Sequence, residues 1–336
     1  MHAPSASSRS RERAVSNAAS CLPLLTALAC APSTDELLPP TADRDPRLPQ
    51  IEIMVAGHRR AIHLETFGSP DAPVLLAFHG GWGSDYRAML PLESLADRYF
   101  VVLWDSRGSG LSERIGRSEI SESAYAEEVQ AIKQRFSPDA PITLIGYSDG
   151  GTHAGLYVAH HAREVEQLVL IEPDAFDSET RSLEPEPEVE AFAQWTHEYL
   201  WQNEFLTPDD HESADYKLTS VAEPAIASVA CHPESPIPYR LWRMGAFVYF
   251  AVRDEFRKFD FRPALAKFEP EILIVATPCH GLDADYQRTH IAPTFAHVRV
   301  VELSAKVDHL NLFDAGHAEL TKALHGYLHA YREVSP

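Results

Sequence analysis

The sequence is poor in cysteine, in basic residues and in long apolar runs, and each shortage excludes a class of protein. Four cysteines among 336 residues are too few for a disulfide scaffold, and their spacing does not match a zinc site. No apolar run approaches the ~18 residues that a membrane-spanning helix needs. Lys and Arg total 29 against 49 Asp and Glu, a formal charge of −20. Because nucleic acids and anionic membranes attract basic surfaces, this charge argues against both as partners.

The first 49 residues differ in composition from the rest of the chain. A basic start rich in Ser and Ala precedes a short apolar stretch, Leu22 to Ala29, and a Pro-rich polar run follows. This order is typical of an export signal, and Cys30, directly after Ala27-Leu28-Ala29, resembles the lipidated cysteine of bacterial lipoproteins. We therefore expect an exported protein with a lipid anchor through Cys30 and a disordered linker up to residue 49. A cytoplasmic protein with a disordered tail is the alternative.

Short segments rich in Val, Ile and Leu recur from residue 50 onwards, with helical stretches such as 123–136 and 151–162 between most of them. Nearly continuous apolar runs are typical of strands buried on both faces of a parallel sheet. We predict an α/β fold with an eight-stranded, mostly parallel sheet flanked by helices. The first two strands form a hairpin with a turn at Gly57-His58. The expected strands are residues 51–56, 60–67, 74–79, 99–104, 142–146, 167–171, 272–276 and 298–303.

About 100 residues separate the sixth predicted strand from the seventh, far more than an ordinary α/β connection. Amphipathic stretches at 189–205 and 239–256 contain several aromatic residues, which need a partner against which to bury. We therefore predict a helical cap, residues 174–268, that lies over the ends of the strands. The α/β core would then consist of residues 50–173 and 269–336.

Two glycine-rich segments at strand ends carry the chemistry. Gly146-Tyr147-Ser148-Asp149-Gly150-Gly151 stands between a buried strand and a helix, the context in which Gly-x-Ser-x-Gly forms a nucleophile elbow with an exposed Ser148 hydroxyl. His79-Gly80-Gly81-Trp82-Gly83 ends the third strand. We expect an N–H from Gly81 or Trp82 to form an oxyanion hole with that of Asp149, worth roughly 3–4 kcal/mol per donor.

A third segment, Trp104 to Ser112, closes the fourth strand, where we expect Asp105 and Arg107 to hold a tight loop without taking part in the reaction. In order and spacing the three motifs resemble those of the α/β-hydrolase superfamily. The particular residues within the motifs resemble those of its proline-iminopeptidase-like and small-esterase branches. The resemblance covers about residues 50–172 and 270–330. It implies the α/β-hydrolase fold and a Ser–acid–His triad in that chain order.

The base of this triad is expected after the last strand, where His309 leaves room for a final helix up to Leu328. His317 is the alternative, but choosing it would consume the start of that helix. The acid stays open between Asp283, the nearest carboxylate after the seventh strand, and Asp174, after the sixth strand, where some family members carry it. Asp285 or an altered triad are further alternatives.

We therefore predict a serine hydrolase that cleaves a small ester or amide through an acyl-enzyme, without a metal or organic cofactor. The expected partner is a small-molecule, short peptide or ester substrate. Asp149 is expected either to cap the helix after Ser148 or to pair with a substrate ammonium group, which would make the enzyme aminopeptidase-like. A carboxylesterase, lactonase or acyltransferase on the same triad and a non-catalytic binding protein on the hydrolase fold are alternatives. The sequence leaves open whether Cys231 and Cys279 pair.

Overall fold

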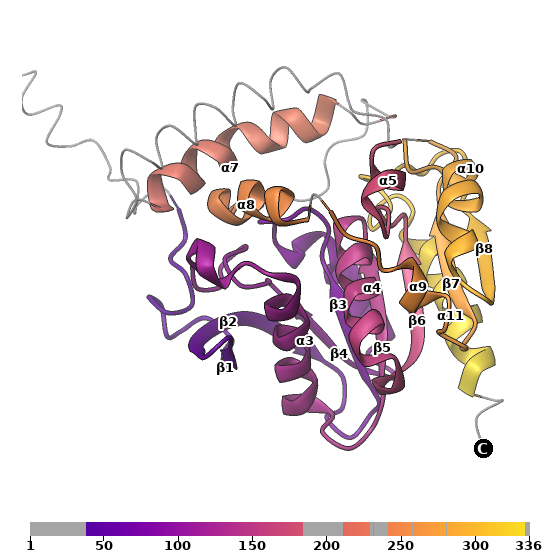
Figure 1. Ribbon diagram of the computed structural model, residues 1–336, viewed down its shortest axis with the longest axis horizontal. Helices are drawn as coiled ribbons and strands as arrows, with labels where there is room; N and C mark the ends of the chain where they lie inside the picture. Colours follow the sequence, from indigo (N-terminus) through magenta and orange to yellow (C-terminus); the bar gives the residue numbers. More distant parts are fainter. Residues whose placement is uncertain are drawn as a thin grey trace, which may run out of the picture.

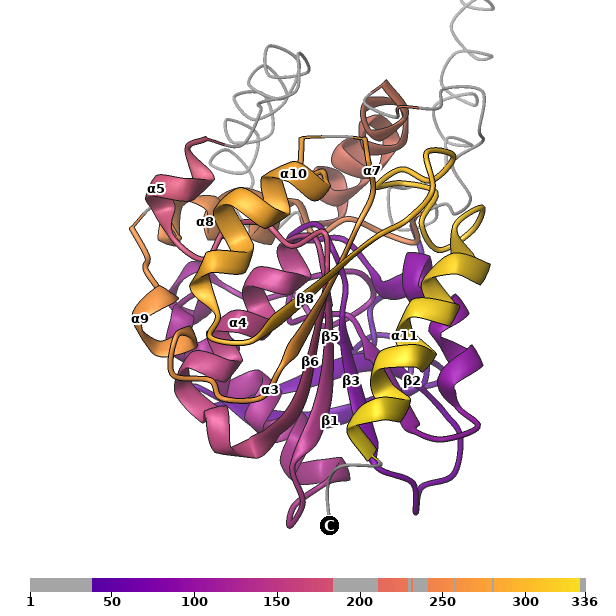
Figure 2. The ribbon, with the colours of Figure 1, turned by 90° about the vertical axis from the view of Figure 1, so that its right-hand side faces the viewer.

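The computed structural model describes residues 38–183, 211–228, 231, 241–256, 258–279 and 281–332. A twisted sheet passes through the middle of the molecule, with helices on both of its faces (Figures 1 and 2). The expected export signal with Cys30, and the expected helical stretch at 189–205, lie outside the described residues. None of the helices in the described ranges is long and apolar enough to cross a membrane.

The eight strands lie within two residues of the predicted positions, which confirms the mostly parallel sheet. The sheet order is β1-β2-β4-β3-β5-β6-β7-β8; β2 pairs antiparallel with β1 and β4, and all other neighbours are parallel. The hairpin turn is Ala56-Gly57 rather than Gly57-His58, because both residues adopt the positive φ (50° and 78°) that a tight two-residue hairpin requires. The strands are β1 (Gln50–Val55), β2 (His58–Phe67), β3 (Val74–Phe78), β4 (Phe100–Trp104), β5 (Ile142–Tyr147), β6 (Val165–Ile171), β7 (Ile272–Ala276) and β8 (Val298–Glu302).

Both faces of the sheet are covered, because alternate side chains of each apolar strand point to opposite sides. On one face, α3 (Glu122–Phe136) and α4 (Asp149–His161) pack against Leu76 and its same-face neighbours. On the other face, η2 (Tyr86–Leu95) and α11 (His317–Arg332) pack against Leu75 and its neighbours. Figure 2 shows α4 and α11 on opposite sides of the central strands. The shorter helices are η3 (Arg117–Glu119), η4 (Ala162–Glu164), α9 (Arg262–Leu265), α10 (Ala284–Tyr286), η5 (Gln287–Ile291) and η6 (Ala292–Thr294).

The long insertion after β6 contributes α5 (Ser178–Arg181), α7 (His211–Ser228) and α8 (Ala246–Glu255). Figure 1 shows α7 and α8 above the sheet. The amide of Gly245, just before α8, donates to the carbonyl of Gly83 at 2.7 Å, so α8 begins against the loop that follows β3. In the described part of the insertion, helices therefore cover the ends of the strands, as the predicted cap requires.

A buried group of charges joins this cap to the core, and we call it the junction cluster: Arg114, Asp215 and Arg243. Asp215 Oδ2 accepts hydrogen bonds from Arg243 Nε at 2.7 Å and from Arg114 Nε at 2.8 Å. Asp215 Oδ1 accepts from the amide of Ala246 at 2.9 Å. Because Asp215 is fully buried on α7 and Arg114 follows β4, the cluster fixes α7 and the start of α8 to the core.

Residues 38–49 do not form the disordered linker that their composition predicts. Leu38 and Ala42 are buried, and the Ala42 amide donates to the carbonyl of Leu111 at 2.7 Å. Arg44 pairs with Glu212 at the start of α7. The segment is therefore held by contacts with both the core and the cap.

A disulfide joins the cap to the core at a second place. Cys231, in the insertion, is bonded to Cys279, in the loop after β7, with Cα atoms 6.4 Å apart, within the usual span of a disulfide. Thr277 Oγ1 lies 2.9 Å from the carbonyl oxygen of Cys279, so the bridge lies beside a residue that reappears at the candidate site. The pairing that the sequence left open is therefore present.

Candidate active site

Ser148 occupies the sharp turn between β5 and α4. Its backbone has φ 53° and ψ −129°, a conformation that L-residues adopt only under strain of about 1–3 kcal/mol. The neighbouring glycines permit it: a Cβ on Gly146 would approach the carbonyl of Gly150 to 2.6 Å. The Ser148 amide donates to the carbonyl of Ile171 on the neighbouring strand at 3.0 Å. The predicted elbow therefore forms, and its turn lifts the Ser148 hydroxyl above the end of the sheet.

His309 approaches Ser148 from the loop after β8. Its Nε2 lies 3.1 Å from Ser148 Oγ. Asp308 Oδ1 accepts from the Asn311 amide at 2.9 Å, and the Tyr147 hydroxyl donates to the His309 carbonyl at 2.6 Å. The ring of Tyr147 also lies against the imidazole, with centroids 4.9 Å apart. A short turn and a neighbouring phenol thus hold the imidazole in place.

The carboxylate beside His309 belongs to Glu172, the first residue after β6. Its Oε2 lies 2.7 Å from His309 Nδ1, while Oε1 accepts from the Thr277 amide at 2.6 Å and from Thr277 Oγ1 at 2.5 Å. The Glu172 backbone also has a positive φ of 42°, which turns its side chain back across the end of the sheet. With Nδ1–H donating to the buried carboxylate, Nε2 is left as the acceptor for the Ser148 proton.

The glycine loop after β3 lies against the nucleophile. A Cβ on Gly80 would come within 2.9 Å of Ser148 Cβ, so only glycine permits this approach. Trp82, two residues after Gly80, is buried against His153 and Phe256, with ring centroids 5.6 and 5.4 Å away. Burial lowers the pKa of His153 to about 3, which keeps this packing neutral. Gly80 therefore brings the loop that carries Gly81 and Trp82 close to Ser148, and the amide of Asp149 opens α4 directly after Ser148.

A model of the alpha/beta hydrolase fold matches residues 73–317 of this chain. The chain belongs to the α/β-hydrolase family. A proline iminopeptidase of Thermoplasma volcanium is 30% identical over 97 residues, which cover 29% of this hydrolase and 33% of that protein. The match thus spans about a third of that relative's length.

Solved structures of other hydrolases share the fold of this α/β hydrolase. An esterase from Thermogutta terrifontis superposes with a TM-score of 0.63 at 17% identity, covering 84% of this chain and 98% of that one. An enol-lactonase from Burkholderia xenovorans superposes with a TM-score of 0.58 at 20% identity, covering 83% and 99%. At these identities the likeness concerns the fold.

The expected positions of the acid were wrong. Asp283 is the N-cap residue of α10, where its side chain accepts from the Tyr286 amide at 2.9 Å. Asp285 is exposed and pairs with Arg288. Asp174 lies three residues after the end of β6, and its carboxylate accepts from Arg181 Nη2 at 3.2 Å. The hydrolase places its acid two residues earlier, because the backbone turn at Glu172 brings the longer side chain under the imidazole.

Asp149 is neither the N-cap residue of α4 nor separate from other charges. The helix begins at Asp149 itself, with Ser148 in the N-cap position. Asp149 Oδ1 accepts from Arg181 Nη2 at 2.9 Å, and the same nitrogen lies 3.2 Å from Asp174 Oδ2. The sequence suggested the Asp149 carboxylate as a partner for a substrate ammonium group, but this carboxylate already pairs with the Arg181 guanidinium.

The loop after β4 has the structural role that its sequence predicts. Asp105 is fully buried and accepts hydrogen bonds from the amides of Leu111 at 2.7 Å and Tyr86 at 3.0 Å. Arg107 Nε donates to Glu128 Oε2 at 2.8 Å. Within the described part of the chain, neither side chain forms a hydrogen bond with Ser148, His309 or Glu172. His317, the alternative base, is the first residue of α11.

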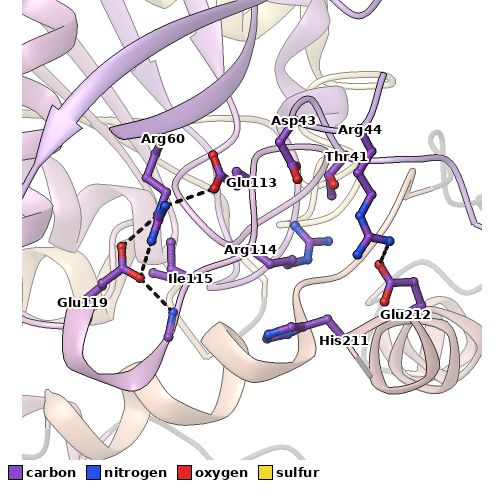
Figure 3. Close-up of a pocket in the computed structure, with 11 residues that line it drawn as sticks. Thr41, Asp43, Arg44, Arg60, Glu113, Arg114, Ile115, Glu119, His211 and Glu212 are labelled. Carbon is purple, nitrogen blue, oxygen red and sulfur yellow. Dashed lines mark hydrogen bonds and ion pairs between the residues drawn. The ribbon is translucent and has the colours of Figure 1, made fainter. Parts of the chain in front are cut away.

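A separate cavity of about 270 Å³ lies between residues 41–44, the loop after β4 and the start of α7 (Figure 3). Arg60 pairs there with Glu119 at 2.8 Å and Glu113 at 3.1 Å, and Arg44 pairs with Glu212. No triad residue lines this cavity, and most of its charges neutralise one another. Within the described ranges, no cluster of three or more His, Cys, Asp or Glu side chains is arranged to hold a metal ion.

Proposed function

We propose that this α/β hydrolase is a serine hydrolase that cleaves a small, uncharged carboxylic ester through an acyl-enzyme. The observation that carries the proposal is a continuous chain of two hydrogen bonds from Ser148 through His309 to Glu172. Ser148 Oγ lies 3.1 Å from His309 Nε2, and His309 Nδ1 lies 2.7 Å from Glu172 Oε2. A hydroxyl, an imidazole and a buried carboxylate in this order activate a serine for acyl transfer.

Each step follows from these positions. Glu172 holds the imidazole with Nδ1 protonated, so Nε2 takes the Ser148 proton as Oγ attacks the ester carbonyl. The amide of Asp149 and that of Gly81 or Trp82 then stabilise the oxyanion. The imidazolium returns its proton to the leaving alcohol, and the acyl group remains on Ser148. A water molecule, deprotonated by His309, then releases the acid.

An aminopeptidase-like reaction is the second candidate. Asp149 directly follows the nucleophile, and its carboxylate pairs with the cationic side chain of Arg181, the kind of partner that a substrate ammonium group would also be. The partial similarity to a proline iminopeptidase points the same way. Lactonase and acyltransferase reactions would use the same acyl-enzyme and differ in the leaving group or the acceptor.

The decisive experiment combines covalent labelling with turnover. We expect a fluorophosphonate probe to label the wild-type protein and not Ser148→Ala. Hydrolysis of p-nitrophenyl acetate should fall at least about a thousandfold in His309→Ala, since the residual rate would come from binding and the oxyanion hole. His317→Ala is the matched control and should retain the rate.

Two outcomes of this experiment would refute the proposal. A wild-type protein that is neither labelled nor active would favour the non-catalytic binding protein. Faster turnover of aminoacyl-naphthylamides than of the nitrophenyl esters would favour the aminopeptidase.

We also propose that the protein works outside the cytoplasm. The Cys231–Cys279 disulfide supports export, because disulfides persist in oxidising compartments. Expression with the native N-terminus in a bacterial host, followed by fractionation and labelling with radioactive palmitate, tests both export and the lipid. Export predicts recovery outside the cytoplasm, and an anchor predicts label in the wild type but not in Cys30→Ala. Recovery of unlabelled protein in the cytoplasm alone would contradict both.

A further inference from the structure

Glu172, the acid of the triad, lies beside the first residue of the loop after β7. Strands β6 and β7 are parallel neighbours, with Ile171 opposite Val275, and the Glu172 amide donates to the Val275 carbonyl at 2.9 Å. Thr277 directly follows β7 and is fully buried. The sheet thus brings Thr277 to Glu172 across a separation of 105 residues.

Thr277 offers two donors to one oxygen of the Glu172 carboxylate. Its amide nitrogen lies 2.6 Å and its hydroxyl oxygen 2.5 Å from Glu172 Oε1, while Glu172 Oε2 lies 2.7 Å from His309 Nδ1. The carboxylate cannot rotate about its last side-chain bond without breaking hydrogen bonds on both sides. Because glutamate has one more rotatable bond than aspartate, more conformational freedom has to be fixed, and the support from Thr277 matters more.

The Thr277 hydroxyl has one proton and two acceptors within reach. Besides Glu172 Oε1 at 2.5 Å, the carbonyl oxygen of Cys279 lies 2.9 Å from Thr277 Oγ1. Hydrogen bonds to an ionised carboxylate are shorter and roughly twice as strong as bonds between neutral groups. The hydroxyl therefore donates to Glu172 as long as the carboxylate is ionised, which is the state in which a triad acid works.

The backbone that carries this hydroxyl is itself held in place. The Thr277 carbonyl accepts from the Ala284 amide at 2.9 Å, and Cys279, two residues after Thr277, is bonded to Cys231. On its other side Thr277 continues directly from β7, in the middle of the molecule. A donor on such a fixed backbone can impose an orientation on the Glu172 side chain.

We propose that Thr277 is a positioning residue of the reaction, whose hydroxyl holds the Glu172 carboxylate in the orientation that faces His309. This inference rests on the proposed function, because the orientation matters only where the imidazole moves a proton. Thr277 acts through Glu172 and His309 and not through the substrate. Its hydroxyl should therefore affect kcat, since acylation and deacylation both use the imidazole, and should leave KM nearly unchanged.

Removal of the hydroxyl at constant shape tests the inference. Thr277→Val keeps the branched side chain and the backbone amide but loses the O–H donor, whereas Thr277→Ser keeps the donor. With p-nitrophenyl acetate we expect kcat to fall at least about tenfold in Thr277→Val, equivalent to about 1.4 kcal/mol, and KM to stay within about twofold. Thr277→Ser should restore kcat to within about threefold of the wild-type value. The rate is counted per molecule that a fluorophosphonate probe labels at completion, so that misfolded protein is excluded.

Two further variants separate an effect through the acid from a general loss of packing. In a double-mutant cycle, Thr277→Val should lower kcat by less than about twofold once Glu172 is replaced by glutamine, because the carboxylate that it orients is gone. Thr143→Val is the matched control: Thr143 is also fully buried, and its hydroxyl lies 3.3 Å from a side-chain oxygen of β6, Gln167 Oε1. It lies at the opposite end of β5 from Ser148, so its kcat should stay within about twofold of the wild-type value.

Three outcomes would overturn the inference while the wild type is labelled and active. They are an unchanged kcat in Thr277→Val, a loss in Thr277→Ser as large as that in Thr277→Val, and an equal loss with and without the Glu172 carboxylate. If Thr277→Val does not fold, Thr277→Ala takes its place in the comparison with Thr277→Ser. Absence of both ester hydrolysis and fluorophosphonate labelling in the wild type would instead refute the proposed function, and the inference with it.

Discussion

The candidate active site and the junction cluster use similar groups in opposite ways. In each, a buried carboxylate faces basic side chains: Glu172 faces one imidazole at 2.7 Å, and Asp215 faces two guanidinium groups at 2.7 and 2.8 Å. An imidazole can lose and regain a proton near neutral pH, whereas a guanidinium stays charged. The first arrangement can therefore move a proton, while the second can only hold elements together.

The backbone conformation also differs between the candidate active site and the junction cluster. Ser148 and Glu172 both have a positive φ, and such strain persists only where the surroundings determine it. At the junction cluster Asp215 lies within the regular helix α7. Substitutions at the candidate active site should therefore change the reaction rate and leave the free energy of unfolding nearly unchanged. Substitutions at the junction cluster should change the free energy of unfolding and leave kcat nearly unchanged.

The largest effect is expected at Glu172. Glu172→Gln removes the charge that orients His309 and stabilises the imidazolium, so we expect kcat for p-nitrophenyl acetate to fall about 10³–10⁴-fold. Thermal unfolding should show a native fold, because the amide fills the same space.

The control for this variant is Asp283→Asn. It changes the carboxylate that sequence analysis favoured, and asparagine still caps α10. We expect its kcat to stay within about twofold of the wild-type value. A loss in Asp283→Asn as large as that in Glu172→Gln would reverse the assignment of the acid.

A large loss of stability without loss of chemistry is expected at Asp215. Asp215→Asn leaves Arg114 and Arg243 without their shared counter-charge in a buried place, which should lower the free energy of unfolding by about 3–5 kcal/mol. Urea unfolding measures this, and kcat per folded molecule should stay near the wild-type value. A variant as stable as the wild type would show that the cluster does not hold the cap.

A smaller, pH-dependent effect is expected at Asp85, which also lies between cap and core. Its carboxylate accepts from the amides of Trp242 at 2.6 Å and Arg87 at 3.0 Å. Burial, with the nearby charge of Asp105, raises the pKa of Asp85 to about 7 from an ordinary 3.8.

The sign of the pH effect follows from this shift. Between pH 4 and 7 the folded state binds more protons at Asp85 than the unfolded state, so the free energy of unfolding falls as pH rises through this window. Asp85→Asn should remove about 3 kcal/mol of that fall. Urea unfolding at pH 4, 5.5 and 7.5 measures it. Parallel pH dependences in variant and wild type would contradict the prediction.

The fold was predictable from the sequence because its strands are buried on both faces. Such strands are nearly continuous apolar runs, and those runs marked all eight strands within two residues. The elbow was predictable for a related reason, since Gly146 and Gly150 are needed where the chain turns within a few residues of Ser148. His309 followed from the length of chain after β8, which has to supply both a loop and α11.

The acid, its partner and the ion pair between Arg181 and Asp149 were not predictable in this way. Nothing local marks Glu172, because its role depends on a turned backbone and on Thr277, more than a hundred residues later. The sequence signal that could have found it was the position directly after β6, where Asp174 was considered instead. The contact between Arg181 and Asp149 likewise joins the end of α5 to the start of α4.

By itself, the sequence determined what short-range sterics and burial control: the positions of the strands along the chain, the sharp turn at Ser148 and the reach of the chain to His309. The tertiary structure alone decided which carboxylate faces the imidazole and which cation faces Asp149. The physical reason is that hydrogen bonds and ion pairs act over about 3 Å, and only the packing of distant strands and helices brings such groups to that distance.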